Sequence, residues 1–468
     1  DDATLQALAT RFDAIQPRMV EWRRDIHQHP ELSGQEVRTA ALVAEHLRKL
    51  GMEVRTGVGG HGVVGLLQGG KPGKVVALRA DMDALPVAEV TGLPFASQVK
   101  QMNMGVESPV MHACGHDGHT AMLMAVAEVL AGMREQIPGT VKFVFQPSEE
   151  GLSSAPVAGK SWGAKAMVEE GALDNPRPDV AFALHIIPNM PSGMIGYRSG
   201  PQFASGDTVR IKIKGKQTHG GFPWNGVDPI VVSAQVVTAL QTIVSRQLNI
   251  SKEPAVLSIG QINGGNRENI VPEAVEMVGT LRAFDEAMRA DAKERITRTA
   301  ESIAAASGAT AEVSFGPSAY PVTTNPEALT EMLAPVLKKV SGGKAMQTSR
   351  LMASEDFSEF QKVVPGLYII LGAAPEGKTP ATAAPNHNPA FDFDEAAMPA
   401  GAKAMAAMTL EFLAKPERPS RRPLQRKRGP AAPVLHAACA VLGSGLSLSA
   451  PRPPSPPRSP RRGPHGRR

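Results

Sequence analysis

The stretch MHACGHDGHTAMLMAVAEVLAGM, residues 111–133, joins a loop dense in histidine to an apolar segment. Its first ten residues hold three histidines, one cysteine and one aspartate. Gly118–Met133 has the length and apolar content of a buried helix. Short apolar runs with β-branched residues lie on either side of it, Val75–Leu78 before and Val141–Phe145 after. A helix between two buried strands is the repeating unit of an α/β sheet.

The same alternation continues outward along the chain. Further buried strands are predicted at Val63–Leu67, Val180–Leu184 and Leu367–Leu371, and further helices at Gly163–Glu170 and Glu395–Leu413. Strands that are apolar along their whole length are typical of sheets covered on both faces. We therefore predict an α/β fold, a doubly wound mixed sheet with helices on both faces.

The pattern changes near Gly200. Thr208–Lys214 alternates apolar and polar residues with a period of two, which indicates a strand with one exposed face. A helix, two strands, a second helix and a last strand are expected to follow. They are Pro229–Leu248, Ala255–Ile262, Ala274–Ala283, Glu286–Ser307 and Ala311–Phe315. The order β-α-β-β-α-β is that of a split βαβ (ferredoxin-like) α+β unit, which we expect to be a small domain inserted in the first one.

These patterns divide the chain into four parts. Residues 1–199 and 318–415 are expected to form the larger, catalytic domain, and residues 200–317 an inserted lid or dimerisation domain. Residues 416–468 are rich in Pro and Arg, with 12 Lys and Arg against one acid, and we predict a disordered basic tail. The tail carries a charge of +11, so that the rest of the chain is at −6 and gives no reason to expect a nucleic-acid partner.

Composition sets further bounds. The chain has 468 residues, 42% of them hydrophobic and 20% charged, as in an ordinary globular protein. There is no apolar run of 18 residues, so neither a transmembrane helix nor a membrane partner is expected. The chain begins at Asp1, which is compatible with a periplasmic or secreted protein after signal-peptide removal and with a trimmed cytoplasmic one. With Cys114 and Cys439 as its two cysteines, the body cannot hold a disulfide framework, which favours Cys114 as a ligand or nucleophile.

Residues whose side chains can ionise or bind a metal follow several of the predicted strands. Asp81 follows Val75–Leu78, and Glu149 and Glu150 follow Val141–Phe145. His185 follows Val180–Leu184, and His387 lies in the loop after Leu367–Leu371. In an open α/β sheet, ligands bind beyond the carboxyl ends of the strands. We therefore expect these side chains to meet at one edge of the sheet.

The residue types at this edge favour metal-assisted hydrolysis. Cys114 and His116 would face the same side in an extended loop, and a thiolate with an imidazole suits Zn, Co, Ni or Mn rather than Mg or Ca. Of two adjacent glutamates, one can bind a metal while the other stays free as a base. Each feature alone has a structural alternative: a buried thiol beside a helix cap, a solvated acidic loop, a core histidine, or a turn histidine in Pro-Asn-His-Asn-Pro.

The chain resembles the aminoacylase/carboxypeptidase-type metallohydrolases, in the branch of the hippurate hydrolases and indole-acetyl-amino-acid hydrolases. The matching blocks run in family order over about residues 1–415. They are RRDIHQHPEL (23–32), LRADMDALP (78–86), MHACGHDGHT (111–120), FQPSEEG (145–151), ALH (183–185), GVDPI (226–230), GTLRAF (279–284), SEDF (354–357) and HNPAFDF (387–393).

The resemblance implies a site with two divalent transition-metal ions, Mn, Zn, Co or Ni. The implied ligands are Cys114, His116, Glu150, His185 and His387. Glu149 matches the catalytic base, and His219 of GKQTHGG matches a histidine that donates to the scissile carbonyl oxygen. Asn269 and Arg282 match substrate-binding positions. Relatives often have Ala or Ser after the histidine, whereas here Gly220 and Gly221 follow His219.

Asp81 and Asp83 lie close to these positions in the sequence. They are expected either to orient the metal ligands through hydrogen bonds or to cap the turn after the strand. An Arg such as Arg282 can clamp a carboxylate in bidentate fashion, which suits an amino-acid substrate.

The expected activity is hydrolysis of the amide in N-acyl or N-aroyl L-amino acids, which are small-molecule substrates. A dipeptidase or carboxypeptidase using the same site is one alternative. A non-catalytic binding protein that acts through its basic tail is another. A homodimer formed through the inserted domain is a further expectation that the resemblance suggests.

Overall fold

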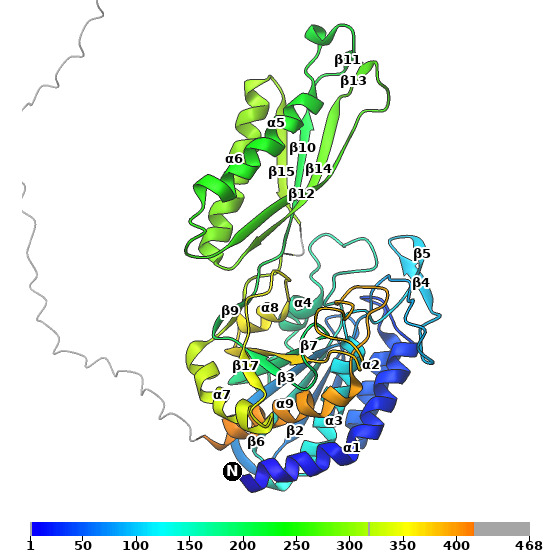
Figure 1. The fold of residues 1–468 in the computed structure, drawn as a ribbon, viewed down its shortest axis with the longest axis vertical. Helices are drawn as coiled ribbons and strands as arrows, with labels where there is room; N and C mark the ends of the chain where they lie inside the picture. The colour runs from blue at the N-terminus through cyan, green and yellow to red at the C-terminus, as the bar shows by residue number, and fades with distance from the viewer. Residues whose placement is uncertain (1, 317–318, 416–468) are drawn as a thin grey trace, which may run out of the picture. The chain divides into compact units, whose positions relative to one another are not determined.

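The computed structural model describes residues 2–316 and 319–415, so the predicted tail, residues 416–468, lies outside the described residues (Figure 1). Its largest element is an eight-stranded mixed sheet. The strand order is β1 (Glu53–Val58), β2 (Gly62–Gln68), β6 (Pro138–Gln146), β3 (Lys71–Asp81), β7 (Val180–Ile187), β18 (Gly366–Gly372), β8 (Ile195–Tyr197) and β17 (Ala345–Gln347). Strands β6, β3, β7 and β18 are parallel to one another, whereas β2 and β8 are antiparallel to their neighbours β6 and β18.

Helices cover both faces of this sheet, as the sequence predicts. Five helices pack with one face, namely α1 (Asp2–Gln28), α2 (Val37–Lys49), α3 (His116–Ala131), α7 (Glu327–Val340) and α9 (Met398–Ala414). The short helices α4 (Gly163–Glu169) and α8 (Phe357–Gln361) pack with the other. Successive residues of a strand point to opposite faces, and accordingly Leu78 belongs to the first core and Ala77 to the second.

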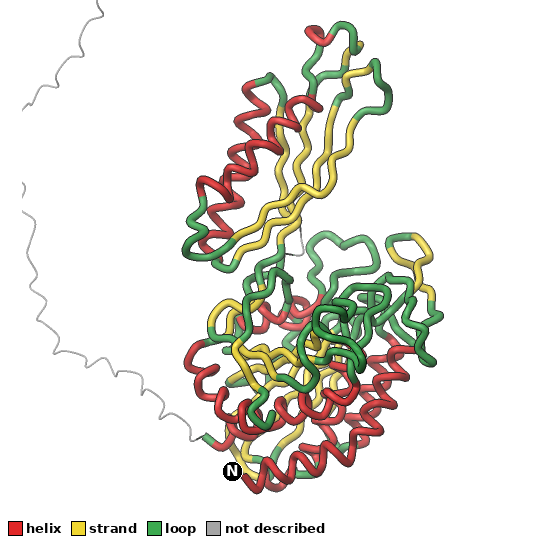
Figure 2. Tube along the Cα trace, in the orientation of Figure 1, coloured by secondary structure: helices red, strands yellow, loops and turns green. Residues whose placement is uncertain are grey.

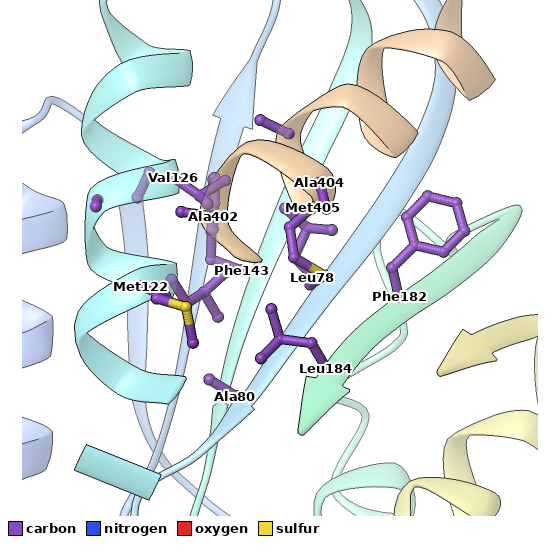
Figure 3. Packing of buried hydrophobic residues seen from close by; sticks show 14 of the residues in the cluster. Leu78, Ala80, Met122, Val126, Phe143, Phe182, Leu184, Ala402, Ala404 and Met405 are labelled. Atoms are coloured by element: carbon purple, nitrogen blue, oxygen red, sulfur yellow. The ribbon is translucent and has the colours of Figure 1, made fainter. Parts of the chain in front are cut away.

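The first core is the larger one. Figure 3 shows Met122 and Val126 of α3 and Ala402 and Met405 of α9 gathered over Leu78 of the sheet. Burying one such Leu or Met side chain contributes about 1.5–3 kcal/mol of transfer free energy. Because α3 begins at His116, this packing also fixes the residue at the helix start relative to the ends of the strands.

A second, four-stranded antiparallel sheet has a core of its own. Its order is β12 (Ala255–Gly264), β14 (Ala274–Ala283), β10 (Asp207–Lys214) and β15 (Thr310–Phe315). Helices α5 (Pro229–Thr242) and α6 (Glu286–Ala306) pack on it. The apolar residues of β10 are buried, so the predicted period-two strand and the predicted β-α-β-β-α-β order are confirmed. The helix predicted to reach Leu248 instead ends at Thr242, followed by a π-helical turn at Ile243–Gln247.

Several short elements had no signal in the sequence, because strands of two to four residues show no periodicity. They are β4 (Lys100–Asn103), β5 (Val106–Pro109), β9 (Gly200–Phe203), β11 (Thr218–His219), β13 (Ile270–Val271) and β16 (Thr323–Asn325). The predicted division at residues 200 and 317 stays a prediction. No helix within residues 2–316 and 319–415 is both long and apolar enough to cross a membrane.

The parallel strands direct the polar residues to one edge of the large sheet. Strand β3 ends at Asp81, and β6 ends at Gln146, shortly before the glutamate pair. His185 was expected after its strand, but β7 continues to Ile187, so His185 lies within the strand near its carboxyl end. Figure 2 shows loops gathered beyond this edge.

Candidate metal centre

The five predicted metal ligands lie together at the carboxyl edge of the large sheet. Cys114 Sγ is 3.4 Å from His185 Nε2, and Glu150 Oε1 is 3.0 Å from His387 Nε2. His116 Nε2 is 4.0 Å from the same Glu150 oxygen. Residues far apart in the sequence thus present nitrogen, sulfur and oxygen donors to one small volume.

The donors form two sets that share Cys114. One set is Cys114, His116 and His185, and the other is Cys114, Glu150 and His387, each with its donor atoms within 4.8 Å of one another. A thiolate can bind two cations at once, so this arrangement suits a pair of metal ions better than a single ion. Burial and the nearby Glu150 and Glu149 raise the pKa of Cys114 well above its usual value. The thiol therefore keeps its proton until a cation displaces it.

His116 is oriented for metal binding. Its Nδ1 lies 2.9 Å from the backbone oxygen and 3.1 Å from a carboxylate oxygen of Asp83, so Nδ1 carries the proton and Nε2 faces the cluster. Within the described residues, His116 Nε2 is buried without a hydrogen-bond partner. A carboxylate behind the imidazole is the usual arrangement for a metal-binding histidine. The residues present therefore fit a transition-metal ion.

The electrostatics of the cluster favour positive charge. Burial lowers the pKa of His116, but Asp81, Asp83 and Glu150 outweigh that effect and raise it to about 10. A cation beside Nε2 would replace the proton that these carboxylates attract. Burial lowers the pKa of His185 well below its usual value, so that ring is neutral and can donate a lone pair.

The other two histidines of the 111–120 stretch are not donors in this cluster. His119 Nδ1 hydrogen-bonds Asp81 at 2.6 Å, and its Nε2 accepts the Ile186 backbone N–H at 2.8 Å, so both ring nitrogens are occupied. Burial lowers the pKa of His112 to about 3, so its ring is neutral. His112 belongs to neither donor set. Asp81 thus orients His119, while Asp83 orients His116.

Glu149 is not one of the predicted ligands, although its carboxylate lies within 4.8 Å of donor atoms of His116 and Glu150. It is 5% exposed, and its Oε2 is 3.9 Å from His116 Nε2. Burial, together with Glu355, Glu150 and Asp356, raises the pKa of Glu149 well above its usual value. A carboxylate with a raised pKa can take up a proton and return it, as a general base and acid must.

A buried charge cluster beneath Glu149 was missed by the sequence reasoning. Arg79 donates to Asp81 at 2.7 Å, to Glu355 at 2.8 Å and to Asp356 at 3.0 Å. The blocks LRADMDALP and SEDF contain these residues, but nothing in either block indicates that they pair. The cluster holds negative charge next to the base, with a single guanidinium among the acids.

Four of the five candidate donors, Cys114, Glu150, His185 and His387, line a cavity of about 690 Å³ that extends to the four-stranded sheet. Arg282 lines it too, and its Nη1 donates to Ser354 Oγ at 2.6 Å. Burial lowers the pKa of Arg282, although Asp207, which also lines the cavity, opposes that effect. A guanidinium in this position can bind an anionic group. Apolar residues complete the wall, among them Phe203, Leu351 and Met352.

His219 and Asn269 do not line this cavity. His219 is exposed on β11, where its Nδ1 accepts from Gly221 N at 2.9 Å. Asn269 lies beside it, since its backbone oxygen accepts from Gly220 N at 2.7 Å. A Cβ on Gly220 would come within 3.0 Å of the Asn269 backbone, which explains why glycine follows His219 here. The predicted roles of His219 and Asn269 stay predictions.

Comparison with known proteins identifies the family of the chain. The model of peptidase family M20/M25/M40 matches residues 77–411. The chain is 41% identical to thermostable carboxypeptidase 2 of Saccharolobus solfataricus over 409 residues, 87% of this chain and 98% of that protein. It is 35% identical to N-acetylcysteine deacetylase of Bacillus subtilis, over 86% of this chain and 98% of that protein. The crystal structure of the Bacillus subtilis YXEP protein, described as a dinuclear metal-binding peptidase, matches with a TM-score of 0.70 and 33% identity, over 86% of this chain and 99% of that one.

The fold and the donor sets define the class of the protein, a metal-dependent amidohydrolase. The chain belongs to peptidase family M20/M25/M40. The resemblance inferred from its sequence blocks is thereby confirmed.

Proposed function

We propose that the protein hydrolyses the amide bond of N-acyl and N-aroyl L-amino acids, giving a carboxylic acid and a free amino acid. The observation that carries the proposal is one cavity that brings together candidate metal donors, a buried glutamate and a half-buried arginine. An N-acyl amino acid needs all three, because it offers an amide to attack, an amine to protonate and a carboxylate to bind.

Two divalent transition-metal ions, Mn, Zn, Co or Ni, would be held by the two donor sets. The residues that would hold them are Cys114, His116, Glu150, His185 and His387. When bound, such ions supply a more acidic water and stabilise negative charge on the scissile carbonyl oxygen. The name of the YXEP protein, a dinuclear metal-binding peptidase, supports two ions rather than one.

Glu149 transfers a proton from the attacking water to the leaving amine. It takes one from the attacking water as that water approaches the carbonyl carbon, and it later passes a proton to the leaving amine. The burial and the neighbouring acids that raise its pKa suit both steps, because the protonated and ionised forms are then closer in free energy.

Arg282 binds the substrate carboxylate, and the Ser354 hydroxyl beside it is a second donor to the same group. The apolar wall of Phe203, Leu351 and Met352 suits an acyl or aroyl group, or the side chain of an apolar amino acid.

His219 and Asn269 would act after a closing motion of the inserted domain, residues 200–317. Because their segments pair through β11 and β13, they would move together. The two would then donate to the substrate from the side opposite the donor sets. A homodimer through the inserted domain belongs to the same proposal, supported by exposed apolar side chains there such as Phe222 and Trp224.

The test is release of free amino acid from N-acetyl, N-benzoyl and dipeptide substrates by chelator-treated protein, before and after addition of Mn²⁺ or Zn²⁺. We expect metal-dependent cleavage of the N-acyl compounds. Loss of all cleavage with full metal occupancy would contradict the proposal.

A carboxypeptidase or dipeptidase activity is the second candidate. The 41% identity to a protein named as a carboxypeptidase favours it. The two candidates differ in whether the acyl pocket accepts a charged α-amine. Faster cleavage of Gly-Phe than of N-benzoyl-Phe would favour the peptidase.

A further inference from the structure

Asn386 contacts two of the segments that carry metal donors. Its side-chain Nδ2 donates to the backbone oxygen of Cys114 at 3.0 Å and to that of Ile186 at 3.1 Å. Ile186 follows His185 in β7. One amide group therefore ties the loop that carries Cys114 to the strand that carries His185.

The same residue is adjacent to a third donor. His387 follows it, and the His387 backbone N–H donates to the oxygen of Ala113 at 2.6 Å. His387 has a φ of +71°, a left-handed conformation that non-glycine residues adopt at an energetic cost. Such a conformation persists where the contacts around it hold the backbone in place. Here those contacts are the bonds that Asn386 and His387 make to residues 113, 114 and 186.

We propose that Asn386 is a positioning residue of the metal centre, which sets the spacing between the donors of Cys114, His185 and His387. The inference rests on the proposed metal centre and adds to it a residue that binds no metal itself. Its role needs the amide to be a donor, since both contacts are to carbonyl oxygens.

The amide also lies close to the sulfur, since Asn386 Nδ2 is 3.9 Å from Cys114 Sγ. Its two N–H groups are directed to the backbone oxygens of Cys114 and Ile186. Asn386→Asp keeps the shape of the side chain but removes both donors and places carboxylate oxygens against two carbonyls and the sulfur. It therefore reverses each favourable contact without leaving a void.

The experiment compares the full chain with Asn386→Asp and Asn386→Ala. Asn388→Ala is the matched control, because Asn388 lies on the other side of His387 and its side chain accepts a bond from Ala390 N, away from Cys114 and Ile186. Chelator-stripped proteins are titrated with Co²⁺, following both the heat of binding and the cobalt–thiolate charge-transfer absorption. We expect 10- to 100-fold weaker Co²⁺ binding in both Asn386 variants, as is usual when the group behind a ligand is lost, with a shifted thiolate band. The control should match the wild type.

Two results would overturn the inference. One is unchanged Co²⁺ affinity and an unchanged thiolate band in Asn386→Asp. The other is wild-type protein that binds no Co²⁺, which would remove the metal centre and the inference together. If the Asn386 variants bind Co²⁺ more weakly but the wild type cleaves no N-acyl amino acid, the inference about Asn386 is supported and the proposed substrate is contradicted. If Asn386→Ala does not fold, as judged by circular dichroism, the isosteric Asn386→Asp decides alone.

Discussion

Replacing Arg79 with methionine tests the buried charge cluster beneath Glu149. Arg79 is 3% exposed and donates to Asp81, Glu355 and Asp356 at 2.7–3.0 Å. Arg79→Met keeps much of the aliphatic volume and leaves these buried carboxylates without their cation. Breaking a buried ion pair from one side costs about 3–5 kcal/mol, because the remaining charge loses its cation in a site without water. Here Glu355 and Asp356 lose the guanidinium, whereas Asp81 keeps its hydrogen bond to His119. We expect the free energy of unfolding in urea at pH 8 to fall by about that amount.

The matched control is Arg38→Met. Arg38 pairs with Asp25 at 2.8 Å, but these side chains are 42% and 40% exposed, so water screens the pair. Losing such a surface pair should lower the free energy of unfolding by less than about 1 kcal/mol. If Arg79→Met cost no more than Arg38→Met under the same metal loading, the reasoning about the cluster would be refuted.

The pH dependence gives a second check on the same variant. Although burial alone would raise it, His116 and Arg79 hold the pKa of Asp81 well below its usual value. Asp81 therefore stabilises the folded protein above its unfolded pKa, and this contribution is lost as the pH falls toward its folded pKa. In Arg79→Met the carboxylates can take up protons instead of remaining charged, so the deficit should be largest at pH 8 and smaller at pH 5. A deficit that grew on acidification would contradict the assigned charges.

Four further predictions concern the site and the tail. Glu149→Gln should keep its metal content and lose turnover by about 10²- to 10⁴-fold, as expected for a general base, and near wild-type kcat would reject that role. Cys114→Ser should bind less metal, measured by elemental analysis, and unchanged stoichiometry would remove Cys114 from the donors. Arg282→Met should raise KM for N-acyl amino acids, but not for the matching amides that lack a free carboxylate. Truncation after Lys415 should leave kcat unchanged, and a large loss would assign a function to residues 416–468.

The sequence by itself determined the class of fold and indicated which residues are the candidate donors. Apolar runs such as Val141–Phe145 have the length and composition of buried strands, and their signal is local, so it can be detected in one chain. The candidate donors were predicted because cysteine, histidine and paired glutamates are rare together, because several lie near the carboxyl ends of strands, and because the sequence blocks resemble those of a known family. Parallel strands direct such residues to one edge whatever the details of packing.

The tertiary structure decided which of these residues face one another. The 111–120 stretch contains three histidines, and its residue pattern does not show which of their ring nitrogens are free to bind a metal. His119 is occupied by Asp81, 38 residues away, and by Ile186, 67 residues away, whereas His116 keeps a free nitrogen. The sharing of Cys114 between two donor sets depends in the same way on segments far apart in the chain.

The structure also separated Arg282, which lines the cavity, from His219 and Asn269, which do not. It revealed the cluster around Arg79 and the bonds of Asn386, neither of which has a sequence signal. The physical reason is common to all of these. The periodicity of apolar residues indicates the type of a segment and its buried face. Hydrogen bonds and charge pairs at a site depend instead on side chains that only folding brings within about 3 Å of one another.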